Sequence, residues 1–265
     1  RTYVAQPLIE KAEIIKRQKL IEVLNANEIT RDEIREYLNP IYDLERLITR
    51  ITYQSANPRD LIAFRDSLKM LPPIKQQLSD IPCELTDEIN EEFDELKDIY
   101  ELLLSSIEDE PPISQRDGDI IKAGYNEEVD RLRDAKTKGK TWLAELEAGD
   151  GEKTGIKNLR IKYNKVFGYY FEVTNSYKNL VPEDYIRKQT LANAERYTTP
   201  RLKELEDTIL NAEDKLQTLE YDVFCRIRDT IAQELVRIQN TAKAIAKLDV
   251  YASLSLVSER NHYVR

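Results

Sequence analysis

Residues 155–203 read GIKNLRIKYNKVFGYYFEVTNSYKNLVPEDYIRKQTLANAERYTTPRLK, and this stretch differs from the rest of the 265-residue chain in pattern and in charge. Apolar and polar residues alternate along it, whereas apolar residues on both sides of it recur every three or four positions. Alternation with period two is typical of strands, and spacing of three to four is typical of helices. We therefore expect a small β-rich module that joins two helical arms.

The same stretch is basic although the protein is acidic. Residues 156–203, called the basic module below, contain ten Lys and Arg and four Asp and Glu, which is ten minus four, or a net charge of +6. The whole chain carries −9, so the other residues together carry −15. Positive charge concentrated at one place favours a polyanionic partner.

Two strands and a turn are predicted inside the basic module. Residues 159–163 and 169–173 alternate apolar with polar side chains, and residues 164–168 between them are typical of a hairpin loop closed by glycine. A two-stranded hairpin is only marginally stable by itself. We therefore expect a third segment, residues 185–197, to pair with it.

Helices are predicted on both sides of the basic module. Charged residues make up 34% of the chain, and all seven glycines fall between Gly118 and Gly168, as expected when long helices occupy the rest. Residues 1–110 are predicted to form a helical bundle in which Asn57 caps one helix and Pro58 takes its first position.

Two longer helices are predicted to flank the module. Residues 119–147 have helical periodicity with a weak point at Gly139, and the glycine-rich residues 148–155 indicate a flexible break. After Pro200 the chain contains no Gly or Pro, and its apolar residues predict one long helix that packs antiparallel to 119–147. The expected fold class is mainly α with a small β-sheet module: a helical core and two long antiparallel helices capped by the β-rich module.

Six residues of the basic module are candidates for contact with a polyanion. Phosphate contact requires Lys, Arg and short polar donors on one surface and needs no shaped pocket. The candidates are Lys162, Lys165, Arg187, Lys188, Asn193 and Arg196. From composition alone, these cations could equally serve only to solvate one face of a small sheet. The aromatic residues Tyr163, Tyr169 and Phe171 are expected to form the module's own core rather than to stack on bases.

The sequence offers no candidate site for catalysis, metal binding or membrane insertion, so we expect no enzyme activity within these residues. Cys83 and Cys225 lie far apart and His262 is the only histidine, so neither a metal cluster nor a catalytic triad is predicted. Buried free thiols indicate a reducing compartment, and no apolar run approaches the ~18 residues of a membrane span. A cytoplasmic location is expected.

Several runs of residues also carry a resemblance to a known family. In the basic module they are NKVFGYY (164–170), YIRKQTL (185–191) and NAERY (193–197). In the flanks they are QPLI (6–9), YDLER (42–46), NPRDL (57–61) and RDG (116–118) with GYN (124–126). Together they resemble the core, lever and clamp regions of the bacterial MutS family of DNA mismatch repair proteins, in the family's order and over essentially the whole chain.

The resemblance implies a core domain, two lever helices and a clamp that contacts the backbone of double-stranded DNA without sequence preference. It implies that the levers couple this clamp to an ATPase domain, so that ATP and Mg belong to the longer parent protein and no cofactor to these residues. It further implies that the parent is a homodimer, partners a MutL-type protein and is associated with the nucleoid. The chain is accordingly expected to be a piece of a longer protein.

Domain boundaries and departures from the family follow from the same resemblance. The core and first lever are expected at residues 1–151, the clamp at 152–199 and the second lever at 200–265. Ala192 stands where Lys is common, and Gly149-Asp150-Gly151 replaces a charged helical run. The rival interpretation is a structural coiled-coil adaptor whose basic module binds a protein partner.

Overall fold

The computed structural model describes residues 2–264 and confirms the expected fold class, because helices dominate and one small antiparallel sheet is present. The elements in chain order are α1 Thr2–Ala5, α2 Lys11–Ala26, α3 Glu28–Leu38, α4 Leu44–Thr52, α5 Pro58–Leu68, α6 Leu71–Ser79, α7 Glu84–Glu92, α8 Lys97–Ser106, α9 Glu127–Thr154, β1 Arg160–Asn164, β2 Gly168–Thr174, the 3-10 helix η1 Asn175–Leu180, β3 Ile186–Thr190, β4 Ala194–Thr198, α10 Pro200–Gln233 and α11 Leu235–Arg260. They form two compact units: residues 1–122 with 223–265, called the helical unit, and residues 123–222, called the sheet unit.

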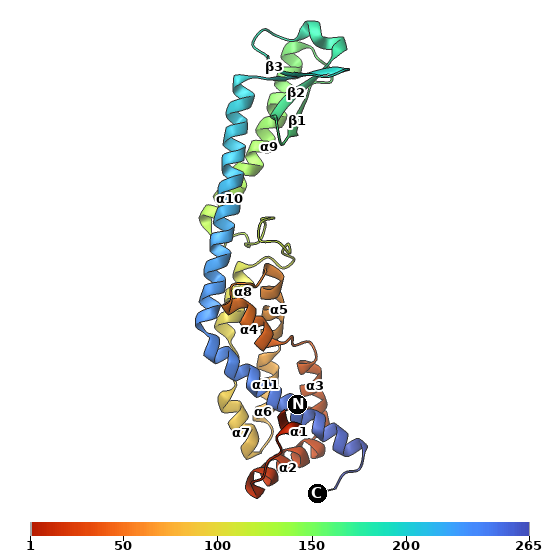
Figure 1. The fold of residues 1–265 in the computed structure, drawn as a ribbon, viewed down its shortest axis with the longest axis vertical. Helices are drawn as coiled ribbons and strands as arrows, with labels where there is room; N and C mark the ends of the chain where they lie inside the picture. Colours follow the sequence, from red (N-terminus) through yellow and green to blue (C-terminus); the bar gives the residue numbers. More distant parts are fainter. Residues whose placement is uncertain (1, 265) are drawn as a thin grey trace. The chain divides into compact units, whose positions relative to one another are not determined.

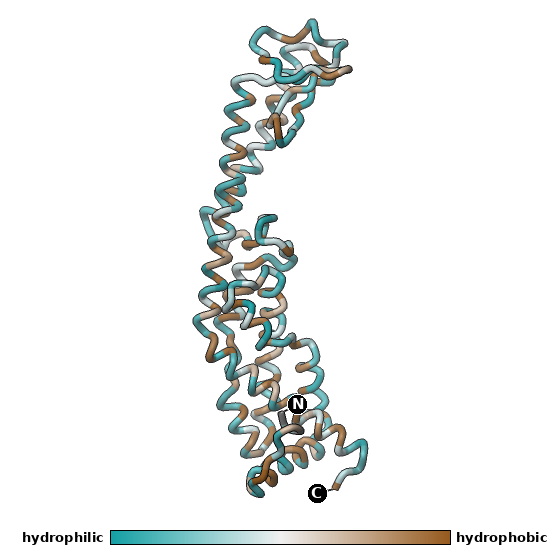
Figure 2. Tube along the Cα trace, viewed as in Figure 1, coloured by the Kyte–Doolittle hydropathy of each residue, from teal (hydrophilic) through white to brown (hydrophobic). Residues whose placement is uncertain are grey.

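The helical unit is organised around α11, which lies against α2, α3, α4 and α7 (Figure 1). Its buried side chains include Leu20, Phe64 and Tyr251. Brown and teal alternate along its helices in Figure 2, as expected for helices that each bury one face. The predicted start of α5 is confirmed: the Asn57 side chain accepts from the amide of Asp60, whose carboxylate accepts in return from the amide of Asn57.

The sheet unit contains α9 and the part of α10 up to residue 222, which run antiparallel beside a small sheet (Figure 1). The strand order of the sheet is β1-β2-β4-β3. The predicted hairpin is confirmed, because β1 and β2 pair antiparallel and their last pair is Asn164 with Gly168, whose φ is +70°. Residues 185–197 join the sheet as predicted, although they form two strands rather than one. A tight turn separates β3 from β4, and the amide of Leu191 donates to the carbonyl of Ala194 at 2.8 Å across it.

One face of this sheet is apolar and packs against α9 and α10. A buried cluster joins the strands to both helices; its members are Leu143, Leu146, Ile156, Leu159, Phe171, Val173, Tyr185, Tyr197, Leu202 and Ile209. Phe171 is fully buried, and its ring lies 5.3 Å from that of Tyr185. Tyr169 packs against the same cluster, and its ring lies 4.9 Å from the half-exposed Tyr163. Phe171 and Tyr169 therefore belong to the core of the module.

The flexible break expected at residues 148–155 is wrong, because α9 continues without interruption to Thr154. The helix ends at Gly155, whose φ of +73° is left-handed and whose amide donates to the carbonyl of Gly151. Two contacts hold the glycine-rich turn in place: Leu146 is buried in the cluster, and the Tyr185 hydroxyl donates to Asp150 Oδ2 at 2.9 Å. Such packing outweighs the helix penalty of about 1 kcal/mol for each glycine.

The start of the same helix also differs from the prediction. α9 begins at Glu127 rather than near 119, and the Asn126 side chain caps it by accepting from the amides of Glu128 and Val129. Before it, Ile121 pairs with Ile107 in an isolated β-bridge. The positive φ angles at Gly118, Asp119 and Gly124 exclude a helix from this stretch.

The single long helix expected after Pro200 is interrupted once. Glu234 has φ −90° and ψ 16° and separates α10 from α11. Next to the break, Arg237 Nε lies 2.9 Å from Asp94 Oδ2 and Arg237 Nη1 lies 3.0 Å from Asp98 Oδ2. One non-helical residue leaves the spacing of apolar residues almost unchanged, so periodicity alone could not reveal the break.

Gly139, expected to be a weak point of α9, is instead where α9 and α10 approach closely. A Cβ atom at this position would lie 2.5 Å from Ile209 Cγ1, which is closer than packed carbon atoms tolerate. Gly149 lies in the same helix, but a Cβ there would meet no atom within 4 Å. The two glycines therefore have different roles: Gly139 permits helix packing, and Gly149 does not contribute to it.

We predict opposite effects of alanine at these two positions. Gly139→Ala should lower the free energy of unfolding, because overpacking costs about 1–3 kcal/mol and exceeds the gain in helix propensity. Gly149→Ala should raise it by about 0.5–1 kcal/mol, because alanine favours the helix and meets no neighbour. Urea unfolding followed by circular dichroism measures both, and equal stabilisation by the two changes would contradict the close helix contact.

Candidate nucleic-acid interface

The second face of the sheet, called the outer face below, lies opposite the apolar cluster and is charged. In the antiparallel register Arg160 on β1 is opposite Glu172 on β2, and Glu172 is opposite Arg196 on β4. Residues opposite each other in neighbouring strands share a face. Two positions from Arg160, Lys162 therefore lies on the same face. The face carries cations on both sides of a central carboxylate.

The cations of the outer face are held by contacts within the module. Lys162 Nζ lies 2.7 Å from Glu172 Oε1, and Arg196 Nε lies 3.9 Å from Glu172 Oε2. The Arg196 guanidinium lies over the ring of Tyr170, with its carbon 4.4 Å from the ring centre, and its Nη1 donates to Gln189 Oε1 at 2.7 Å. Arg196 is therefore fixed in direction, whereas Lys162 remains half-exposed.

Arg187 belongs to a different cluster, which surrounds the buried carboxylate of Glu195. Lys178 Nζ lies 2.7 Å and Arg187 Nη1 3.6 Å from Glu195 Oε1, and the Tyr197 hydroxyl donates to the other oxygen. The hydrogen bond from Lys178, with that from Tyr197, lowers the pKa of Glu195 below its ordinary value. Burial, together with the hydrogen bond to Glu195, raises the pKa of Tyr197 to about 12. The cluster links η1 and β3 to β4.

The remaining candidates lie near the turns of the sheet. Lys188 Nζ donates to the carbonyl of Phe167 at 2.8 Å, which ties β3 to the hairpin loop. The loop itself is fixed because the amide of Val166 donates to Asn164 Oδ1 at 2.8 Å. The side chains of Lys165 and Asn193 are exposed, and neither has a side-chain partner among residues 2–264.

The six predicted residues thus lie in one module but not in one uniform row. Lys162 and Arg196 share the outer face, Arg187 joins the Glu195 cluster, and Lys165 is the exposed cation of the hairpin loop. Sequence reasoning missed Lys178 and the partner carboxylates Glu172 and Glu195, because cross-strand neighbours are known only once the register is known. Further exposed cations of the basic module are Lys157, Arg201 and Lys203. The binding role of all these residues stays a prediction.

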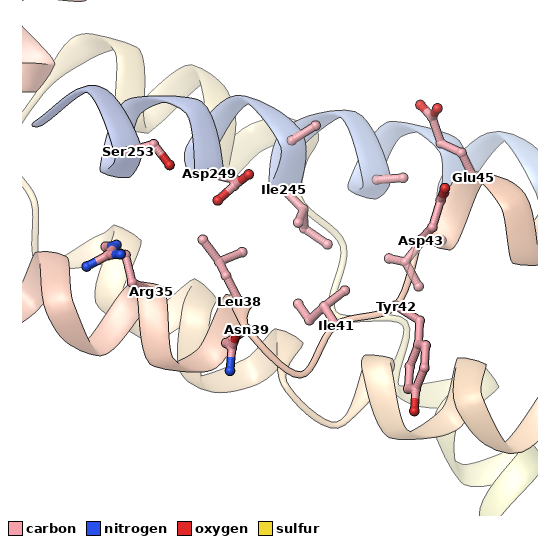
Figure 3. Close-up of a pocket in the computed structure, with 13 residues that line it drawn as sticks. Arg35, Leu38, Asn39, Ile41, Tyr42, Asp43, Glu45, Ile245, Asp249 and Ser253 are labelled. Atoms are coloured by element: carbon pink, nitrogen blue, oxygen red, sulfur yellow. The ribbon is translucent and has the colours of Figure 1, made fainter. Parts of the chain in front are cut away.

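The helical unit contains a groove of about 430 Å³ (Figure 3). Leu38 and Ile41 face Ile245 of α11 across it, and Arg35 and Ser253 lie at one end. Its lining contains no His or Cys, and residues 2–264 include no cluster of three or more potential metal ligands. The groove therefore has none of the groupings that catalysis by a triad or a metal requires.

Three further features bear on function in the described part of the chain. Residues 149–154, which superficially resemble a phosphate-binding loop, lie inside α9, where their amides serve the helix and cannot cradle a nucleotide. Cys83 and Cys225 are both free thiols. No helix between residues 2 and 264 combines the length and the apolar character that crossing a membrane requires.

Glu195 makes the stability of the sheet unit pH-dependent. A carboxyl whose pKa is lowered by folding stabilises the protein above its unfolded pKa of about 4.3, and this contribution is lost as the pH falls through the lower folded pKa. We predict that Glu195→Gln lowers the melting temperature at pH 7 and that the difference from wild type shrinks below about pH 4. Melting curves between about pH 3 and about pH 7 measure this; a difference that is constant with pH would contradict it.

The comparisons with known proteins agree with the fold. A model of the MutS domain III family matches residues 1–255. The DNA mismatch repair protein MutS of Lachnoclostridium phytofermentans is 63% identical over the whole chain, that of Caldanaerobacter subterraneus subsp. tengcongensis is 55% identical over the whole chain, and that of Acetivibrio thermocellus is 48% identical over 99% of it. The chain spans 28% of the first protein and 30% of the other two. Matched over nearly its whole length, the chain belongs to the MutS domain III family.

Proposed function

We propose that the basic module is a clamp that binds the backbone of double-stranded DNA without sequence preference, as part of a DNA mismatch repair protein. The observation that carries the proposal is the net charge of +6, ten cations against four carboxylates, on a sheet that keeps one face apolar and turns charged side chains outward. Membership of the MutS domain III family and relatives named as DNA mismatch repair proteins support it.

The chemistry of the module suits phosphates better than base edges. Exposed cations such as Lys165, and half-exposed ones such as Lys162 and Arg187, attract phosphate oxygens from an open surface. Reading bases would require a helix or ribbon that enters a groove with directed donors and acceptors. The cations of the module contact carboxylates and carbonyls around a small sheet instead. Such contacts favour binding to DNA that does not depend on the base sequence.

We assign the role of paired levers to α9 and α10. Within the sheet unit these helices are joined by the contact of Gly139 with Ile209 and by an ion pair of 2.6 Å between Arg133 and the buried Glu220. Such a pair moves as one body, because each helix fills the surface of the other. A force applied to its far part is therefore transmitted to the sheet.

The wider setting is proposed from the relatives. The levers would connect the clamp to an ATPase elsewhere in the full polypeptide, where ATP and Mg bind, and two copies would hold the duplex between two clamps. We further propose that the full polypeptide forms a homodimer and binds a MutL-type partner. It would act on DNA in the cytoplasm, in association with the nucleoid. The support for this setting is that the MutS relatives are more than three times as long as this chain, which covers 28–30% of them.

A coiled-coil adaptor whose module binds a protein is the second candidate. The observation in its favour is the exposure of apolar side chains on the module, with Val166 82% and Ile186 58% exposed. A salt titration separates the two functions. Binding to DNA phosphates weakens with a log–log slope set by the number of phosphates contacted, whereas an apolar protein contact depends little on salt.

Lys165 offers the cleanest test of the DNA proposal, since it makes no ion pair that its loss would break. We predict that Lys165→Gln weakens binding to all duplex sequences alike and reduces the magnitude of the salt slope by about one. Fluorescence anisotropy of the full polypeptide that contains this chain, with several unrelated duplexes across a range of salt, measures both quantities. Arg187 is less suitable, because its loss also disturbs the Glu195 cluster.

The matched control is Lys215→Gln, which removes the same charge from an exposed position of α10 outside the basic module. It should leave affinity and slope close to those of the wild type. Equal effects of Lys165→Gln and Lys215→Gln would mean that net charge, and not the module, governs binding.

A further inference from the structure

Glu172 is a carboxylate at the centre of the cationic outer face. It lies on β2, directly between Arg160 on β1 and Arg196 on β4. Arg160 is engaged elsewhere, since its Nη1 lies 2.7 Å from Glu147 Oε1. The contacts of Glu172 are therefore with Lys162, at 2.7 Å, and with Arg196, at 3.9 Å. About a quarter of its side chain is exposed, so the solvent reaches this group of charges.

Arg196 presents an unused donor to this carboxylate. Its Nη1 is bonded to Gln189, and its guanidinium is held over the Tyr170 ring. Its Nε is buried and has no hydrogen-bond partner among residues 2–264. The distance of 3.9 Å to Glu172 is too long for a hydrogen bond. The buried Nε of Arg196 therefore donates no hydrogen bond, and a buried donor in this state is energetically unfavourable.

A phosphate group would satisfy both cations. Its oxygens accept charge-assisted hydrogen bonds from guanidinium and ammonium groups, and a carboxylate presents the same kind of oxygen with less charge. Glu172 covers the Arg196 Nε and neutralises Lys162, so it occupies the place that a phosphate oxygen would take. While Glu172 remains between the two donors, its negative charge opposes the approach of a phosphate to both of them at once, because like charges repel.

We propose that Lys162 and Arg196 form a subsite for a phosphodiester of the DNA backbone and that Glu172 fills this subsite in the free protein. The proposal rests on the proposed DNA-binding function and extends it. DNA must displace Glu172 before it gains these two contacts. Because Lys162 is already neutralised by a protein carboxylate, it neutralises less phosphate charge, and fewer of the cations condensed on the DNA are released on binding. Glu172 thus lowers the affinity for DNA and makes this affinity less dependent on salt concentration.

The test is Glu172→Gln in the full polypeptide that contains this chain, with a DNA duplex without mismatches as the probe. Glutamine keeps the size of the side chain and an acceptor for Lys162 but removes the charge. We expect binding about three- to tenfold tighter near 0.1 M salt. The salt slope should also become steeper by about one.

Glu183→Gln is the matched control. Glu183 is exposed in the same module, and residues 2–264 offer it no ion-pair partner, so the change alters net charge by the same amount without touching the subsite. The increase in affinity for the duplex should be several times larger for Glu172→Gln than for Glu183→Gln. Equal gains would overturn the proposal, because they would reflect net charge alone.

Two further variants connect the effect to its partners. In a Lys162→Gln background, Glu172→Gln should lose most of its gain, because one of the two donors that it frees is missing. Glu172→Ser, which empties the subsite, should give the same direction of change as Glu172→Gln. Melting curves of every variant show whether the fold is retained, and unchanged or weaker binding by both well-folded Glu172 variants would overturn the proposal.

The outcomes also separate this proposal from the function on which it rests. If Lys162→Gln and Arg196→Gln weaken DNA binding while Glu172→Gln leaves it unchanged, the clamp function stands and Glu172 is only a structural partner. If Lys165→Gln, Lys162→Gln and Arg196→Gln all leave DNA binding unchanged, the DNA-binding function of the module itself is wrong.

Discussion

The sheet unit depends on the packing of one apolar sheet face against α9 and α10. Strand pairing alone gives a small sheet little stability, so burial of an apolar face has to offset the order that the strands impose on the chain. Phe171 and Tyr197 on the strands, with Leu143 and Leu146 on α9, supply the missing buried area. This contact explains why α9 stays helical through its glycines, and why the core aromatics are not available for stacking on bases.

The same packing decides how the charges are arranged. With one face of the sheet occupied by the helices, cations must crowd onto the other face and the edges, where strands lie about 4.8 Å apart. At that spacing cations repel, and carboxylates between them relieve the repulsion. Glu147, Glu172 and Glu195 take this role for Arg160, Lys162 and Arg187 respectively. The module is therefore strongly basic in total, although several of its cations are paired with carboxylates.

If the module is the proposed DNA clamp, local pairing would favour release of the DNA as well as binding. A surface of bare cations would bind tightly and depend steeply on salt, whereas paired cations exchange one anion for another at a smaller net gain. The MutS relatives carry this domain within chains more than three times as long. In the proposed function, a weak contact by the clamp would be strengthened by the other parts of the full polypeptide, since linked sites act at high effective concentration.

The sequence by itself determined the fold class, the hairpin at residues 164–168, the Asn57 cap, the basic module and the family. These features depend on residues close together in the chain, whose periodicity, turn chemistry and motifs can be read directly. Only the tertiary structure decided the strand order, the continuity of α9, the break at Glu234 and the partners of the cations. The penalty of about 1 kcal/mol per helical glycine is smaller than the free energy gained by burying a side chain such as Leu146. Contacts between residues far apart in the sequence therefore keep α9 helical. Likewise, the register between neighbouring strands brings Glu172 next to Lys162 and Arg196. This register cannot be predicted from residues that are close together in the sequence.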